Sequence, residues 1–194
     1  MANLITVGRL ILLFVVVALI YFGDANVVGI CMFFILAVFA SDGLDGYVAR
    51  KTKTTSEFGA VFDIAGDRIV ENVLWIIFAD LDLIPIWVPL LVLTRGFIVD
   101  GLRSLSYARG MTAFGERNMM RSRFTEWLTA GRFMRALFGY AKAIAFVFLT
   151  GLYADGLPSA EGTWVQALYN VPGLTAIGWT IVWLAVALTI IRGL

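Results

Sequence analysis

The chain has 194 residues, of which 60% are hydrophobic and 15% charged, and its formal net charge is +1. This composition, with a mean hydropathy of +0.88, excludes an ordinary soluble domain and indicates a polytopic membrane protein. The near-zero net charge argues against a nucleic-acid partner, and the absence of histidine excludes histidine-based acid/base or nucleophilic chemistry. The single cysteine, Cys31, excludes an intrachain disulfide.

Apolar runs of roughly 17–25 residues predict six membrane-spanning helices. The expected spans are Leu4–Phe22, Asn26–Arg50, Phe58–Ala79, Leu83–Arg109, Arg132–Tyr153 and Val171–Ile191. The first run lacks a basic leader and a small-residue cleavage site, so we expect a retained helix there. A single membrane domain, residues 1–194, accounts for the whole length.

Charged residues are distributed unequally between the connections. The connections after the first, third and fifth expected spans carry no lysine or arginine, only Asp24, Asp80, Asp82, Asp155 and Glu161. The other connections are rich in basic residues, among them Arg50, Lys51, Lys53, Arg117, Arg121 and Arg123. The positive-inside rule then places both termini in the cytoplasm. The expected fold is an all-α integral membrane protein with six transmembrane helices and a cytoplasm-facing polar pocket, in a bacterial or archaeal inner membrane.

Four aspartates interrupt the apolar sequence between the second and third spans. Asp42 and Asp45 are three residues apart and Asp63 and Asp67 are four apart, so on helices each pair shares a face. Carboxylates at membrane depth are expensive and usually have a partner or a function. Hard divalent cations suit such oxygen ligands and often bind together with substrate phosphates. The alternative is that Arg50 and Arg68 simply neutralise these acids, which leaves the neighbouring glycines unexplained.

The aspartates belong to a longer pattern, D-x-x-D-G-x-x-A-R, eight residues, then G-x-x-x-D-x-x-x-D. Every position is met, by Asp42, Asp45, Gly46, Ala49, Arg50, Gly59, Asp63 and Asp67. This stretch, residues 42–67, resembles the signature of the CDP-alcohol phosphatidyltransferases, integral-membrane enzymes of phospholipid synthesis.

The resemblance implies transfer of a phosphatidyl group from a CDP-linked lipid such as CDP-diacylglycerol to an alcohol, with release of CMP. It implies that two Mg²⁺ or Mn²⁺ ions are held by Asp42, Asp45, Asp63 and Asp67, and that Asp67 is the general base. Residues expected to contact the nucleotide are Ser41, Gly46, Ala49, Arg50 and Gly59. Family members are commonly homodimers, which we also expect here.

Arginines suggest the class of acceptor. Arg95 and Arg103 are eight residues apart and share a helix face, and Arg132 and Arg135 open the fifth span. Guanidinium groups suit phosphate oxygens, so these four arginines are candidates for binding a phosphorylated acceptor. The alternative for the first pair is snorkelling toward the membrane surface, with Asp100 as an internal partner of Arg103.

The run RGFIVDGLR resembles the R-E-x6-R stretch of phosphatidylglycerophosphate synthases, although Gly96 replaces the acid. GRFMR matches their second motif only loosely. We therefore expect glycerol 3-phosphate as acceptor, with inositol phosphate as the alternative. A membrane metal-ion transporter is the alternative outside this class, but it predicts acidic residues spread through the membrane depth, and here they cluster at one surface.

Overall fold

The computed structural model describes residues 2–52, 57–108 and 132–191, and these ranges contain helices but no strand. The long helices are α1 (Ala2–Phe22), α2 (Ala25–Thr52), α3 (Glu57–Asp80), α4 (Trp87–Ala108), α6 (Arg132–Asp155) and α8 (Leu174–Ile191). A 3₁₀ turn, η1 (Pro158–Ala160), and a short helix, α7 (Trp164–Tyr169), lie between α6 and α8.

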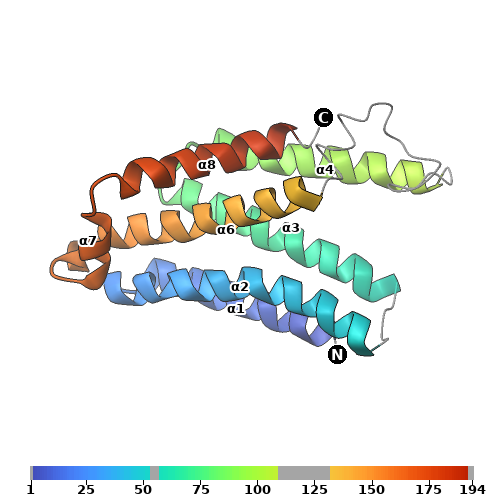
Figure 1. Ribbon diagram of the computed structural model, residues 1–194, viewed down its shortest axis with the longest axis horizontal. Coiled ribbons are helices and arrows are strands. Elements are labelled where there is room, and N and C mark those ends of the chain that lie inside the picture. Colours follow the sequence, from blue (N-terminus) through green and yellow to red (C-terminus); the bar gives the residue numbers. More distant parts are fainter. Residues whose placement is uncertain (1, 53–56, 109–131, 192–194) are drawn as a thin grey trace.

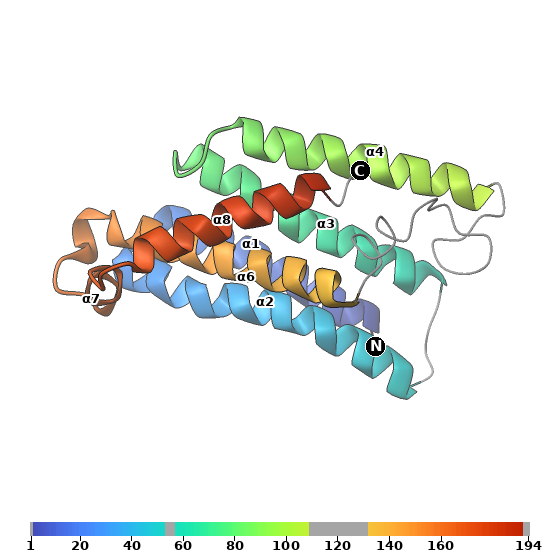
Figure 2. The same cartoon turned by 45° about the horizontal axis from the view of Figure 1, so that its top comes forward.

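The long helices run along the long axis of a bundle (Figure 1). One end, the N-terminal end, holds the start of α1, the end of α2 and the start of α3 (Figure 2). The opposite end holds the α1–α2 and α3–α4 turns together with α7. This arrangement brings both halves of the aspartate motif to the N-terminal end of the bundle.

Breaks between the helices follow local chemistry. The Asp24 carboxylate accepts a hydrogen bond from the backbone N–H of Val27 at 2.9 Å at the start of α2. Asp82, after the end of α3, adopts a positive φ of 56°. The expected start of the fourth helix at Leu83 is wrong by four residues, because Pro85 disfavours a helical conformation at the residue before it and α4 begins at Trp87.

The core is built around α6, which packs against α2 and α8. Trp75 and Phe78 of α3 are fully buried against Phe146 of α6, and the Trp75 and Phe146 rings meet edge-to-face with centroids 4.7 Å apart. Such an arrangement is the preferred geometry for aromatic pairs. The packing against α6 therefore fixes the position of α3, which carries Asp63 and Asp67, two of the four motif aspartates.

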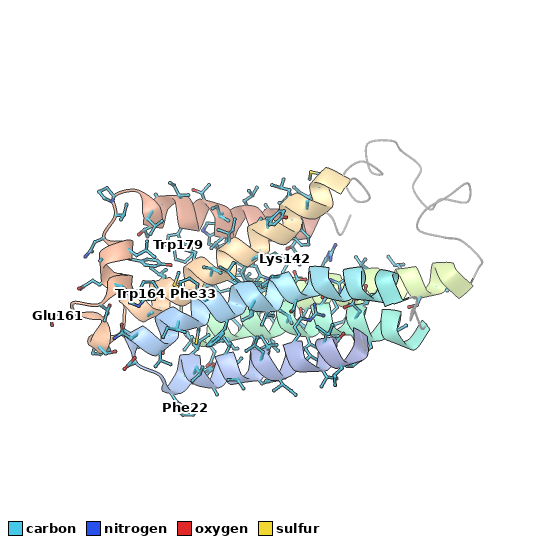
Figure 3. The ribbon with its side chains drawn as sticks, turned by 60° about the horizontal axis from the view of Figure 1, so that its bottom comes forward. Phe22, Phe33, Lys142, Glu161, Trp164 and Trp179 are labelled. Atoms are coloured by element: carbon cyan, nitrogen blue, oxygen red, sulfur yellow. The ribbon has the colours of Figure 1, made fainter. Side chains whose placement is uncertain are left out.

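The opposite end of the bundle is tied by aromatic residues. The Tyr169 hydroxyl of α7 donates to the carbonyl oxygen of Phe148 at 2.7 Å, and burial together with the Asp155 carboxylate raises the pKa of Tyr169. Trp164 lies near Phe33 of α2, with ring centroids 6.1 Å apart (Figure 3). These contacts hold α7, which begins at Trp164, against α2 and α6.

Large apolar side chains cover much of the outer surface. Leu4, Phe22 and Phe97 are 75%, 91% and 74% exposed. In the described ranges, three segments are long and apolar enough to cross a membrane: Leu4–Phe22, Ala136–Asp155 and Leu174–Ile191. A shorter apolar helical segment is Ala25–Ser41. These properties fit a membrane protein.

Candidate functional site

Asp63 and Asp67 lie one turn apart near the start of α3, as their spacing predicts. Their side chains are 41% and 51% exposed, so each carboxylate is partly covered and partly open. The described part of the acidic motif therefore consists of two carboxylates on one face of α3, at the N-terminal end of the bundle.

Arg9 of α1 contacts both aspartates. Its Nη1 lies 2.9 Å from Oδ1 of Asp67, and its Nη2 lies 3.5 Å from Oδ1 of Asp63. The Arg9 side chain is only 2% exposed, so the ion pairs form at the buried contact between α1 and α3. The sequence interpretation assigned Arg9 no role, although it is the one charged residue in the Ala2–Phe22 helix. A single charged residue within an apolar helix usually has a buried partner or a function, and this feature of the sequence could have singled out Arg9.

Gly66 allows this contact between the helices. A Cβ atom at that position would lie 2.8 Å from Nη2 of Arg9 and 2.9 Å from Cγ2 of Thr6. Both distances are below a normal van der Waals contact, so the absence of a side chain lets α1 pack directly against α3 beside the aspartates.

A second charged network lies deeper along α3. Glu71 is buried and accepts from Nζ of Lys142 on α6 at 2.9 Å. Arg68 donates two hydrogen bonds to Asp100 of α4, from Nε to Oδ2 and from Nη2 to Oδ1, each 3.1 Å long. Its Nη1 is also 3.9 Å from Oε2 of Glu71. These contacts join α3 to both α4 and α6, and Lys142 turns into the bundle instead of toward the surface (Figure 3).

The network bears on the alternative in which Arg50 and Arg68 neutralise the aspartates. Arg68 pairs with Asp100 and Glu71, whereas Arg9 pairs with Asp63 and Asp67. An Asp100–Arg103 pair remains a prediction, because the Arg103 side chain lies outside the described part of the chain.

The first half of the motif is placed only by its backbone. The last turns of α2 carry Asp42, Asp45, Gly46, Ala49 and Arg50, but their side chains are not among those described. The Ser41 hydroxyl donates to the carbonyl oxygen of Val38 at 2.8 Å, and Gly59 lies in the first turn of α3. Because a connection of four residues, 53–56, joins α2 to α3, the end of α2 and the start of α3 can be at most about 18 Å apart.

The expected acceptor arginines lie on α4 and α6. Arg95 lines a groove of about 530 Å³ with residues of α4 and with Ile190 of α8. Arg103 lies two turns further along α4. Arg132 and Arg135 lie in the first turn of α6. The side chains of Arg103, Arg132 and Arg135 are outside the described part of the chain.

The donor set is chemically suited to hard divalent cations, because the described pair provides carboxylate oxygens that are half open to solvent. Among the described side chains no three acidic, histidine or cysteine residues form a metal-sized cluster. Asp63 and Asp67 alone would therefore need further oxygen ligands, which the last turns of α2 carry in sequence as Asp42 and Asp45.

A model of the CDP-alcohol phosphatidyltransferase family matches residues 1–191. The chain belongs to this family. The match extends far beyond the 26-residue signature and includes α1, where Arg9 lies, and the last long helix, α8.

Individual relatives of the chain carry two kinds of name. A Bacillus subtilis protein named CDP-diacylglycerol–glycerol-3-phosphate 3-phosphatidyltransferase is 34% identical over 41% of the chain and 40% of its own length. A Cereibacter sphaeroides protein of the same name is 28% identical over 98% of the chain and 90% of its own length. A Mycobacterium tuberculosis protein named "Putative cardiolipin synthase" is 26% identical over 97% of the chain and 82% of its own length. The chain spans only about half the length of the first curated relatives that it matches.

Proposed function

We propose that the chain transfers the phosphatidyl group of CDP-diacylglycerol to the hydroxyl of glycerol 3-phosphate and releases CMP. The observation that carries this proposal is the complete aspartate motif, whose second half lies on one face of α3, at the same end of the bundle as the last turns of α2. The names of the Bacillus and Cereibacter relatives support the choice of donor and acceptor.

The proposed membrane arrangement has six spans, formed by α1, α2, α3, α4, α6 and α8, in one domain over residues 1–194. Both termini and the aspartates would face the cytoplasm. The basic connections at 50–53 and 117–123 support this orientation, since lysine and arginine favour the cytoplasmic side. A lipid-linked donor and a water-soluble acceptor can then meet at the membrane surface. The protein would act as a homodimer, by similarity to the family.

Asp42, Asp45, Asp63 and Asp67 would together hold two Mg²⁺ or Mn²⁺ ions. Bound there, the ions would neutralise the diphosphate of the donor and stabilise the charge that develops on the departing CMP. The four carboxylates would orient the diphosphate through the ions, two of them coming from the last turns of α2 and two from α3.

Asp67 is proposed as the general base. Its carboxylate would take the proton of the acceptor hydroxyl while that oxygen forms a bond to the β-phosphorus, and the bond from this phosphorus to the oxygen of CMP breaks. An aspartate is a weak base, with a reference pKa of about 3.9, so its positioning matters more than its basicity. The exposed half of the Asp67 side chain gives an acceptor room to approach.

The proposed nucleotide contacts are Ser41, Gly46, Ala49, Arg50 and Gly59. The small residues Gly46, Ala49 and Gly59 would leave space for the cytidine between α2 and α3. Arg50 at the end of α2 would contact a phosphate.

Arg95, Arg103, Arg132 and Arg135 would bind the phosphate of the acceptor, because planar guanidinium groups match phosphate oxygens. Two further acceptors have support. Inositol phosphate would use the same arginines. Phosphatidylglycerol is favoured by the Mycobacterium relative, since a cardiolipin synthase of this family would transfer a phosphatidyl group to that lipid.

The test is CMP release by the purified protein in lipid vesicles containing CDP-diacylglycerol and Mg²⁺. Glycerol 3-phosphate, inositol phosphate, phosphatidylglycerol and serine are supplied one at a time. We expect release with glycerol 3-phosphate, loss of release with EDTA, and a fall of at least about 10²-fold in Asp67→Asn, the range for a lost general base. Release with none of the four acceptors would overturn the proposed function, and release with another acceptor alone would overturn the choice of glycerol 3-phosphate.

A further inference from the structure

Arg9 is a buried cation that the proposed reaction does not use. It lies on α1, outside the aspartate motif, yet its guanidinium reaches Asp63 and Asp67 on α3 with two different nitrogens. Its surroundings are shaped for this contact, because Thr6 is buried on the same face of α1 and Gly66 leaves space for the guanidinium between the two aspartates.

We propose that Arg9 is a positioning residue of the acidic site: it fixes the carboxylates of Asp63 and Asp67 and lowers the negative charge that an incoming divalent cation meets. The proposal rests on the proposed function, in which those carboxylates bind metal and one of them is the base.

The geometry supports the positioning role. Both contacts are made at Oδ1 of the aspartates, one turn apart. The guanidinium holds Asp67 at hydrogen-bond distance, 2.9 Å, and Asp63 in a longer ion pair of 3.5 Å without a hydrogen bond between the two atoms. Arg9 itself is 4% exposed and packed between helices, so its position is set by α1 and not by solvent. The aspartates are half exposed, so they are held from the α1 side and remain accessible from another.

The charge of Arg9 also has a consequence. Two carboxylates and one guanidinium sum to −1 at this part of the site, where the carboxylates alone would give −2. A fixed cation near a divalent ion opposes its binding, by an amount that grows where water is excluded. Arg9 would thus weaken metal binding while it orients the base, so its removal should affect the two in opposite directions.

The test compares Arg9→Gln, Arg9→Lys and a matched control, Tyr21→Phe. Tyr21 donates to Asp80 and so links α1 to α3 at the opposite end of the same helix pair. If Arg9 only tied the two helices together, Arg9→Gln would behave like Tyr21→Phe: the melting temperature would fall, and metal binding and turnover of the folded protein would be unchanged.

Mn²⁺ binding to the purified protein is measured by electron paramagnetic resonance, without substrate, and turnover by CMP release. For Arg9→Gln we expect Mn²⁺ affinity to rise about tenfold, because a positive charge is lost. We expect its kcat to fall by about 10²-fold, because the base is no longer held in place. Arg9→Lys keeps the charge, so it should bind Mn²⁺ like the unmodified protein but turn over more slowly. Tyr21→Phe should match the unmodified protein in both.

Unchanged Mn²⁺ affinity and kcat in folded Arg9→Gln would overturn the role of Arg9 alone, and so would a parallel loss of both. If Arg9→Gln does not fold, Arg9→Lys decides: full kcat would overturn the positioning role. If the unmodified protein binds no Mn²⁺, the metal site of the proposed function is wrong, and the role of Arg9 is wrong with it. This outcome is distinguished from the others because it is seen in the unmodified protein and not only in the Arg9 variants.

Discussion

At the scale of single residues, the described ion pairs of the acidic region lie mainly between helices. Asp100 receives two hydrogen bonds from Arg68 on another helix, and Asp63 and Asp67 receive a guanidinium from α1. The motif spacing could predict that Asp63 and Asp67 share a face of α3, because a helix fixes that relation locally. It could not predict Arg9 as their partner, because which face of α1 meets α3 depends on packing between segments that lie more than 50 residues apart.

The Lys142–Glu71 pair provides a prediction at this scale. Glu71 and Lys142 have side chains that are 6% and 14% exposed, so removing Lys142 leaves the buried Glu71 carboxylate with only the longer contact to Arg68 at 3.9 Å. Lys142→Met should lower the free energy of unfolding by about 3–5 kcal/mol, the usual range for breaking a buried pair. Replacing both, as Lys142→Met with Glu71→Met, should recover much of that loss, since neither charge then remains buried.

Denaturation in mixed detergent micelles measures both variants, with Lys142→Arg as the control that keeps the charge. A double variant less stable than Lys142→Met alone would contradict the prediction. Arg68 would then have to be the stronger partner of Glu71, although its nitrogen lies 3.9 Å away.

At the scale of helices, the sequence predicted the existence of the long helices better than their ends. The Phe22 end of the first span is confirmed by α1, whereas α8 begins at Leu174, three residues after the expected Val171. Apolar length is a property of the whole run and can be read from the residues that form it. A helix end depends on turn geometry, here a positive φ of 86° at Gly173, which composition does not reveal.

Close contact between α6 and α8 depends on Gly178. A Cβ atom there would lie 2.2 Å from ring carbons of Phe148, and that ring is held between Tyr169 and Trp179. Gly178→Ala should therefore force the helices apart and lower stability by about 1–3 kcal/mol, as overpacking does in other cores.

Thermal unfolding in detergent checks this prediction. Gly139→Ala on α6 is the matched control, because an added Cβ there meets nothing within 4 Å. The control should be as stable as the unmodified protein or slightly more so, since alanine favours a helix. Equal melting temperatures for the two alanine variants would show that the Phe148 ring can move aside, contrary to the prediction.

At the scale of the whole molecule, the number of spans decides how the acidic site is oriented. By length and composition, three described helices are able to cross a membrane, α1 among them, while α3 and α4 carry charged residues along much of their length. Several of those charges pair between helices, Arg68 with Asp100 and Glu71 with Lys142 of α6, which reduces the penalty of placing them in the membrane. Hydropathy alone cannot register this compensation, so the proposed six-span layout is argued from length, charge asymmetry and packing together.

The two layouts predict opposite labelling patterns. With the N-terminus in the cytoplasm, six spans place position 53 inside and position 161 outside the cell membrane. If only the three most apolar helices crossed, position 53 would lie outside and position 161 inside. Cys31 is buried and is the single cysteine of the chain, so Cys31→Ala provides a background for new cysteines.

In that background, Lys53→Cys and Glu161→Cys are each treated with a membrane-impermeant maleimide, on intact spheroplasts and on permeabilised ones. We expect Glu161→Cys to react in intact spheroplasts, since Glu161 is exposed near α7, and Lys53→Cys to react only after permeabilisation. The reverse pattern would exclude the six-span layout with a cytoplasmic N-terminus, and it would move the aspartate motif to the outer surface. A charged, water-soluble acceptor cannot cross the bilayer unaided, so the orientation of these two positions decides from which side of the membrane it can reach Asp63 and Asp67.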